Sequence, residues 1–315
     1  MKIKMVGMVM LAAWTSISAA WAEVLVILPQ SGHMARAGNS VKAGIEAAHQ
    51  AYADQIALKF IDSQTHSLKE ALAQVTAKTR LVIGPLDRQR VEQWVKQDLA
   101  IPRLTLNHIQ QQKKGVYQFA LSKEEDAIAL TARMQADGVK HVYVLQQAQT
   151  QAETQSTLAA LKQQWATQSQ LVKQLPRHLT PQDAVFFLGS QHWLNQHIEL
   201  LKETQPNLQA HVYASAYSVD EIQQFPIGVT LCDASSLYNQ RWEELSALKQ
   251  QEAHAAYLRL MAFGADAWHI ARRILSDADH STVFAARTGD IQIANKIIRT
   301  PKCMLRQPQG WMEYP

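Results

Sequence analysis

Seven residues at the ends of predicted strands are the best candidates in this sequence for holding a small polar molecule. They stand in short loops that follow apolar runs: Ser31, Gly32, Asp87, Thr105, Asn107, Ser215 and Tyr217. Hydroxyl groups, together with backbone N–H groups at helix starts, suit a carboxylate or another polar ligand. Any one of these loops is more simply explained as a cap or a turn, since the same residue types serve there. As a set the loops predict a cleft, and they leave open whether it holds a ligand.

The sequence contains no motif for catalysis or for binding a metal or cofactor. It lacks GxSxG, a Walker A loop, HExxH and CxxC. His192 and His197 are five residues apart, so they do not share a helix face. The acids of Glu124–Asp126 suit the first turn of a helix, where they complement the helix dipole. Asp266, beside Trp268, is interpreted as a hydrogen-bonded packing residue. We therefore expect a protein that is not an enzyme and uses no metal or cofactor.

The first 22 residues have the pattern of a cleaved export signal. Lys2 and Lys4 precede an apolar stretch, Met5–Trp14, and Ala20–Ala22 has the A-x-A form of a cleavage site. The apolar stretch is too short to span a membrane, and no cysteine in or just after it offers a site for lipid attachment. Cleavage removes two lysines and no acid, so the formal net charge falls from +4 to +2. The sequence predicts a periplasmic protein with no membrane anchor and no nucleic-acid partner.

Two cysteines, Cys232 and Cys303, lie in the part that follows the signal. In an oxidising compartment two cysteines most simply form one disulfide. The alternative is that both are small buried apolar side chains. The sequence favours the disulfide.

Strand and helix patterns alternate twice along the chain. Val24–Leu28 is a continuous β-branched apolar run, typical of a strand buried on both faces, and apolar residues at helical spacing follow it. The alternation continues to Asn107, resumes at His141–Leu145 and ends near Ser218. Each unit is expected to be a doubly wound parallel sheet with helices on both faces. Three Ser-x-x-Glu patterns predict capped helix starts, namely Ser67/Glu70, Ser122/Glu125 and Ser218/Glu221.

The last third of the chain departs from this alternation. Ala253–Leu275 is the longest predicted helix, and Thr288–Asp290 is a hairpin-type turn. No Gly/Ser-rich or Pro-rich linker separates the two α/β units, so we expect short structured crossovers, as in a hinged clamshell. The expected division is a signal peptide (1–22), lobe 1 (23–120, with a returning segment at about 235–285) and lobe 2 (121–234, with the tail at about 286–315).

Several stretches resemble a known family. The opening resembles type 1 periplasmic binding proteins and reads VLVILPQSGHMARAGNSVKAGIEAA. Three further stretches are similar to the carboxyl-terminal domain of LpoA-type penicillin-binding protein activators, namely LVIGPLDRQRVEQW, IPRLTLNH and HVYASAYS. The tail follows the same domain in order, with LMAFGADAWHIARRI, RTGDIQI and CMLRQPQGWMEY. The resemblance covers the chain from Val24 to Tyr314.

This resemblance implies a two-lobed clamshell of the type 1 periplasmic-binding-protein kind and a role in regulating peptidoglycan synthesis. The implied partner is a class A penicillin-binding protein, bound without catalysis. Members of the activator family are outer-membrane lipoproteins with a helical repeat domain ahead of this one. Here no lipobox cysteine is seen, and the α/β pattern begins directly after the signal.

The alternative hypothesis is a soluble periplasmic receptor that closes on an amino acid or a similar small polar ligand. A receptor needs unobstructed polar groups that converge in the cleft, whereas an interaction domain can fill the cleft with its own side chains. Arg88, His108 and Tyr217 are the bulky candidates for such filling.

Overall fold

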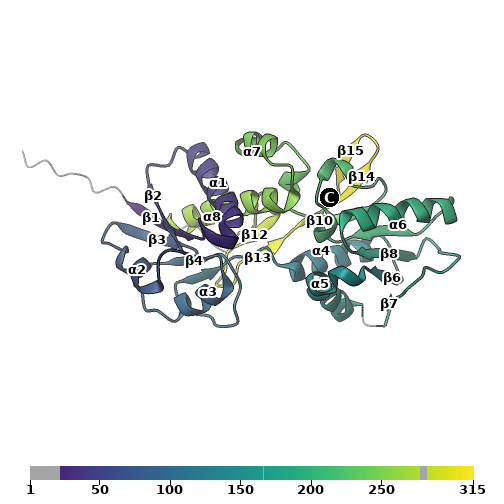
Figure 1. The fold of residues 1–315 in the computed structure, drawn as a ribbon, viewed down its shortest axis with the longest axis horizontal. Helices are drawn as coiled ribbons and strands as arrows, with labels where there is room; N and C mark the ends of the chain where they lie inside the picture. The colour runs from purple at the N-terminus through teal and green to yellow at the C-terminus, as the bar shows by residue number, and fades with distance from the viewer. Residues whose placement is uncertain (1–21, 166, 277–281) are drawn as a thin grey trace, which may run out of the picture.

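The computed structural model describes residues 22–165, 167–276 and 282–315. Over these ranges the chain forms two α/β lobes that lie side by side (Figure 1). The predicted signal peptide lies outside the described residues, apart from Ala22.

A five-stranded parallel sheet in the order β2-β1-β3-β4-β5 forms the centre of lobe 1. Helices α1 and α8 pack against one face of it, and α2 and α3 pack against the other. Because β1 is a central strand with helices on both sides, all of Val24–Leu28 is buried, as its apolar run predicts. The elements are β1 (Glu23–Leu28), α1 (Ala35–Ala51), β2 (Ala57–Asp62), α2 (Leu68–Ala73), β3 (Thr79–Ile83), α3 (Arg88–Val95), β4 (Arg103–Thr105), β5 (Val116–Gln118) and α8 (Ala255–Leu275).

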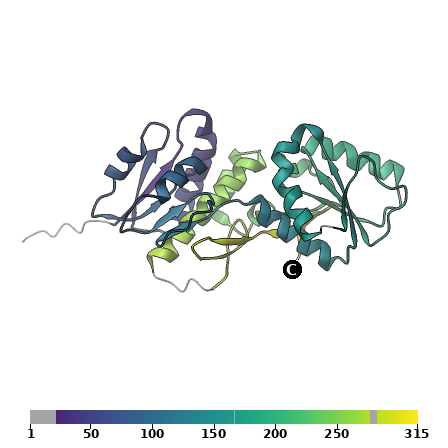
Figure 2. The same cartoon turned by 90° about the horizontal axis from the view of Figure 1, so that it is seen from below.

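Helices α1 and α8 come together at a distance that only glycine permits. A Cβ atom on Gly44 of α1 would stand 1.8 Å from the carbonyl oxygen of Met261. One on Gly264 of α8 would stand 2.0 Å from the carbonyl oxygen of Val41. These two glycines attach α8 to lobe 1, although α8 follows the α/β unit of lobe 2 in the sequence (Figure 2).

Lobe 2 is built on a seven-stranded sheet in the order β15-β14-β10-β9-β8-β6-β7. Strands β6 to β10 are parallel, whereas β14 and β15 join as an antiparallel extension. Helices α4 and α5 cover one face, and α6 covers part of the other. The elements are α4 (Lys123–Ala136), β6 (His141–Gln146), α5 (Gln151–Gln164), β7 (Ser169–Leu171), β8 (Asp183–Leu188), α6 (Gln191–Thr204), β9 (His211–Ala214), β10 (Thr230–Asp233), β14 (Lys302–Gln307) and β15 (Gly310–Glu313).

The segment between α8 and β14 forms a small antiparallel sheet of β11 (Phe284–Ala285), β12 (Asp290–Gln292) and β13 (Ile298–Thr300). Between β12 and β13 the chain continues lobe 1, because the amide of Gln118 donates to Asn295 O at 2.8 Å and the amide of Ile297 donates to Gln118 O at 2.8 Å. We expected the tail to join lobe 2 at about residue 286. In the structure it first extends the edge of lobe 1 and enters the sheet of lobe 2 only at β14.

The predicted helix starts meet three different outcomes. Ser67 and Glu70 form a complete capping box at the start of α2, as predicted. Ser122 caps α4, but the Glu125 carboxylate accepts from the backbone of Arg299 instead of reaching back. The helix predicted after Ser218 is wrong: the segment holds only single 3-10 turns, and Ser218 is buried beside Ser215. Short α7 spans Ser246–Gln251.

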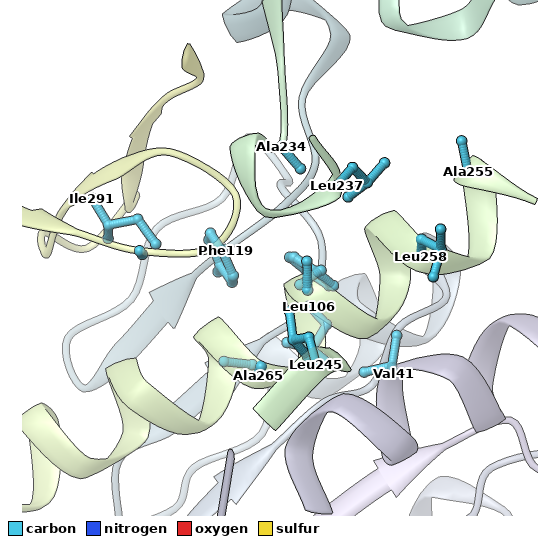
Figure 3. Close-up of a cluster of buried hydrophobic side chains, with 14 of the residues drawn as sticks. Val41, Leu106, Phe119, Ala234, Leu237, Leu245, Ala255, Leu258, Ala265 and Ile291 are labelled. Atoms are coloured by element: carbon cyan, nitrogen blue, oxygen red, sulfur yellow. The ribbon is translucent and has the colours of Figure 1, made fainter. Parts of the chain in front are cut away.

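One apolar core runs through both lobes and the region between them. Close to the crossings it contains Phe119, whose ring stacks on Phe263 of α8 with 4.6 Å between centroids. Figure 3 shows Phe119 and Ala265 near Leu106, Leu237 and Ile291, which come from distant parts of the sequence. The lobes are therefore joined by packed side chains as well as by backbone.

Candidate interlobe site

Within the described residues the chain passes between the lobes three times. The first passage lies between β5 and α4, the second follows β10, and the third joins β13 to β14 across Pro301. Polar side chains that the sequence left unexplained gather at these passages. They form two ion-pair clusters, with a third close by at the turn before β12.

Arg299 of β13 joins the third passage to the first. Its side chain is only 2% exposed. One guanidinium nitrogen, Nη2, lies 2.5 Å from Asp126 Oδ1 and donates to Ser122 O at 3.2 Å. Nη1 donates to Thr288 O at 3.2 Å, and Nε lies 3.4 Å from Glu125 Oε2. The guanidinium therefore holds the start of α4 against β13.

Arg259 of α8 makes the corresponding contact at the second passage. Its Nε and Nη2 donate to the two carboxylate oxygens of Asp233 at 2.8 and 2.7 Å. Nη2 also donates to Ala216 O at 2.7 Å. Asp233, the last residue of β10, in addition accepts from the hydroxyl of Tyr238. This fork ties α8, which packs on lobe 1, to two segments of lobe 2.

The third cluster anchors the turn before β12 to α8. Asp266 is buried in α8 and accepts from the backbone of Arg287 at 2.9 Å and of Thr288 at 2.8 Å. The Arg287 side chain continues to Glu244, with Nε 2.8 Å from Oε1. Asp266 is therefore a packing residue with satisfied hydrogen bonds, as we interpreted it from the sequence.

Burial sets the pKa values of the acids in the first cluster. It raises the pKa of Glu125 to about 7, although the positive charge of Arg299 acts in the opposite direction. Burial likewise raises the pKa of Asp126 against the effect of Arg299. For Arg259, burial acts to lower the pKa, but the charge of Asp233 leaves it above the ordinary value. The arginines therefore stay charged, while Glu125 can take up a proton near neutral pH.

A cavity of about 290 Å³ opens beside these clusters, between the start of α4, the end of β9 and the start of α8. Ser215 and Tyr217 line it, as two of the seven candidate ligand residues. Four of the polar side chains around it, those of Lys123, Asp126, Ser215 and Arg259, already have partners. Lys123 Nζ donates to Glu153 O at 2.6 Å, and Ser215 Oγ lies 3.4 Å from Ser218 Oγ. Apart from Asp126, Arg259 and Thr157, the remaining lining is apolar.

The other five candidates lie in lobe 1, outside this cavity, and their polar atoms serve caps and turns. Asp87 accepts from Arg90 N at 3.0 Å at the start of α3. Buried Thr105 donates to backbone carbonyls, as does Asn107 to Leu86 O at 3.2 Å. Gly32 has a φ of 69°, which favours glycine at that turn. The structure therefore brings Ser215 and Tyr217 together but not the full set.

Ser31 completes the set through its neighbour Asp62. Burial acts to raise the pKa of Asp62, but hydrogen bonds from Ser31, Gln64 and Gln30 together hold it below its ordinary value. A carboxylate held in this way fixes the loop after β1 to the end of β2. Ligand binding by the seven residues stays a prediction.

The bulky residues considered as cleft fillers lie in different places. Tyr217 lines the cavity, with Lys123 Nζ 5.8 Å from its ring centroid. Arg88 is exposed on α3 and pairs with Glu92. His108 is half-buried against Gln118 O at 3.2 Å, and burial lowers its pKa to about 4. Of the three, only Tyr217 borders the cavity.

Cys232 and Cys303 are joined in the structure by an S–S bond of 2.03 Å. They stand directly opposite one another in the antiparallel pair of β10 and β14. The bridge lies beside the second and third passages. Cys232 is on β10, next to Asp233, and Cys303 is on β14, the strand that follows Arg299. It therefore closes the tail onto the sheet of lobe 2.

Sequence reasoning did not find Arg259 and Arg299, the two residues that organise this region. Neither stands in a motif, and each pairs with residues far away in the chain. Asp126 lies 173 positions before Arg299. The nearest signal was the run Glu124–Asp126, whose members also suit an ordinary first helical turn.

Two further observations concern the described residues. No group of three His, Cys, Asp or Glu side chains in the described ranges is placed to hold a metal ion. Over the same ranges, no helix has the length and apolar character needed to cross a membrane.

Two doubly wound lobes joined by three passages, with a cavity between them, define the class of type 1 periplasmic-binding-protein-like folds. Residues 17–174 match the family model described as "LppC putative lipoprotein", which is half of the chain. The chain belongs to the LppC family.

Similarity to individual proteins agrees with this assignment. The chain is 23% identical over 273 residues to the penicillin-binding protein activator LpoA of Pasteurella multocida (strain Pm70). The match covers 79% of this chain and 46% of the relative, so the chain spans about half the length of that curated protein.

Solved structures show the same fold. The LpoA (YraM) C-domain of Haemophilus influenzae superposes with a TM-score of 0.74 at 19% identity, covering 93% of this chain and all of that chain. A full-length LpoA of the same organism gives 0.73 at 19% identity, with 59% of its length covered. A solute binding protein of R. palustris in complex with benzoate gives 0.54 at 16% identity, covering 93% of this chain and 95% of that chain.

Proposed function

We propose that this protein is a non-catalytic periplasmic regulator that binds a class A penicillin-binding protein and thereby controls peptidoglycan synthesis. Three lines support the proposal. The first is membership of the LppC family, whose relative in Pasteurella multocida is a penicillin-binding protein activator. The second is the fold of the Haemophilus influenzae C-domain, which is described as a regulator of PBP1A.

The third line carries the proposal, and it is the pairing of the charges between the lobes. Arg299 and Arg259 pair with Asp126 and Asp233 and donate to backbone carbonyls. A solute receptor instead keeps polar groups free in the cleft and closes on its ligand by moving at the hinge. With the passages held together by forked ion pairs, this protein is better suited to present a fixed outer surface to a partner. An activator of this kind works by binding more tightly to an active conformation of its partner than to other conformations.

The direct test uses the exported protein and the purified class A synthases of the same cell. We expect a complex in a pull-down and faster glycan polymerisation or peptide cross-linking when the protein is added. An unrelated binding protein of the same fold serves as the negative control. Absence of both binding and stimulation would contradict the proposal.

A solute receptor is the second candidate, favoured by the cavity beside Ser215 and Tyr217. Thermal unfolding against a library of amino acids tests it, since a ligand at 100 times its Kd stabilises by about 2.7 kcal/mol. Tyr217→Ala, a change at a side chain that is 38% exposed, should abolish such a shift if the ligand sits in the cavity. The same variant should stimulate the synthase as the wild type does if the protein is a regulator.

A further inference from the structure

A second hollow lies on lobe 2, away from the passages, with a volume of about 480 Å³. We call it the distal groove. One wall is the outer half of α6, and the other is the segment 173–177 that follows β7. Its floor is formed by Leu145 of β6, Phe187 of β8 and Leu201 of α6, all of them buried. The groove therefore has an apolar floor built on the sheet of lobe 2.

The groove exists because one connection of lobe 2 lacks a helix. Strands β7 and β8 both pair in parallel with β6, so the chain must cross over β6 to connect them. In doubly wound sheets such a crossing is usually made by a helix that covers the sheet. Here residues 172–182 contain no helix and include Pro176 and Pro181. The segment is held at its start and near its middle, since Val172 N donates to Val144 O at 2.9 Å and the Gln205 side chain donates to Pro176 O at 2.9 Å.

An apolar side chain at the mouth of the groove is open to solvent. Leu200 of α6 lines the groove and is 54% exposed, in contrast to the buried Leu201 beside it. A large exposed leucine next to an apolar hollow is the arrangement found where a partner places an anchor side chain.

The charges at the rim are of one sign. Lys173 and Arg177 line the groove, and neither makes a hydrogen bond or ion pair with another described residue. The described residues of the lining include no Asp or Glu. Glu199 of α6 is not part of the lining and pairs with Lys202. An occupant that complements this surface carries carboxylates beside a large apolar side chain.

We propose that the distal groove docks a segment of the class A penicillin-binding protein in which one or two large apolar side chains stand next to acidic residues. This inference rests on the proposed function and adds the surface and the chemistry of its partner. The apolar side chain enters between α6 and segment 173–177, and the carboxylates lie over Lys173 and Arg177.

The test measures the affinity of the exported protein for the purified synthase by biolayer interferometry. Leu200→Glu places a negative charge at the mouth of the groove, and we expect it to weaken binding by about tenfold or more. The matched control is Leu171→Glu on β7, where the leucine is also exposed, at 49%, but lies outside the groove. The control should bind within about twofold of the wild type.

A second pair of variants tests the charges. Lys173→Glu/Arg177→Glu should slow association by about tenfold at low salt, with a smaller difference at about 0.5 M salt, where surface charges are screened. Lys162→Glu, at an exposed position of α5, is the control for a change of charge elsewhere on lobe 2. Circular dichroism and thermal unfolding of every variant check that it is folded.

Each outcome decides between the two proposals. Unchanged affinity in both groove variants, with the wild type bound to the synthase, overturns the groove proposal alone. A wild type that binds no class A synthase overturns both. Self-association in sedimentation experiments that Leu200→Glu abolishes would identify a second copy as the occupant and would also overturn the groove proposal.

Discussion

Arg299 and Asp126, on elements of different lobes, lie 2.5 Å apart from Nη2 to Oδ1. The arginine belongs to β13, the last strand before the tail enters lobe 2, and the aspartate to the first turn of α4. The pair therefore fixes two of the three passages to one another.

Removing one partner of this pair should be costly. Arg299→Met leaves Asp126 and Glu125 without their counter-charge, and we expect a loss of about 3–5 kcal/mol in the free energy of unfolding. Urea unfolding followed by circular dichroism measures it. Lys202→Met, which breaks the exposed pair with Glu199, is the matched control and should cost less than about 1 kcal/mol. Equal losses in the two variants would show that the buried Arg299 pair stabilises the fold no more than an exposed pair does.

Glu125 should make the stability depend on pH. Burial raises its pKa from the ordinary 4.5 to about 7, so the folded protein binds this proton more tightly than the unfolded chain does. The contribution of Glu125 is then full below pH 4.5 and is lost as the pH rises through 7, a change of about 3 kcal/mol.

The informative quantity is the difference between the wild type and Glu125→Gln. Other groups titrate over the same range, and His108 acts in the opposite sense, because its lowered pKa gives stability that is lost as the pH falls below 6.5. The difference in unfolding free energy between the wild type and Glu125→Gln should change by about 3 kcal/mol between pH 4.5 and 7.5. A flat difference, or a Glu125 carboxyl that titrates near 4.5 by NMR, would refute this.

The Cys232–Cys303 bridge should be present in the exported protein and should contribute to its stability. The two cysteines are separated by 71 positions, and a closed loop of that length corresponds to about 4 kcal/mol in the chain-entropy model. Peptide mapping without reduction detects the bridge, and unfolding with and without reductant measures its effect. Two thiols that alkylate freely in unreduced, denatured protein would contradict the prediction.

Gly44→Ala should destabilise the protein, against the usual trend in helices. In an exposed helix interior this substitution stabilises by about 1 kcal/mol. Here the new Cβ would stand 1.8 Å from Met261 O, so α1 and α8 must move apart. We expect a loss of about 2 kcal/mol or more in urea unfolding. A gain in stability would mean that the two helices separate at no cost.

Export should remove the first 22 residues. The pattern of Lys2 and Lys4, an apolar stretch and Ala20–Ala22 predicts cleavage after Ala22. Mass spectrometry of the periplasmic protein should find Glu23 as the first residue. A chain that retains Met1, or that carries a lipid, would show that the segment is used differently.

Local patterns in the sequence were sufficient for the class of fold. The apolar run at Val24–Leu28 predicts a central strand because both of its faces must be buried, and the box at Ser67 predicts the start of α2 because both partners lie within four residues. Signals of this kind depend only on neighbours in the chain, so they can be recognised without knowing the tertiary contacts.

Where a tertiary contact competed with a local one, the local pattern failed. The Glu125 carboxylate accepts from the backbone N–H of Arg299 instead of completing a capping box. Ser218 is buried next to Ser215, where no helix forms. The candidate site shows the same division. The loops after the strands were recognisable by residue type, but which of them share a cavity depends on how the lobes pack.

By itself, then, the sequence determined two doubly wound lobes, the export pattern and the resemblance to the activators. Only the tertiary structure decided that Arg299 and Arg259 hold the passages together, that Gly44 and Gly264 attach α8 to lobe 1, and that a groove opens beside Leu200. These features join residues separated by long stretches of chain. Their spacing in sequence therefore carries no periodic signal, and only burial and distance reveal them.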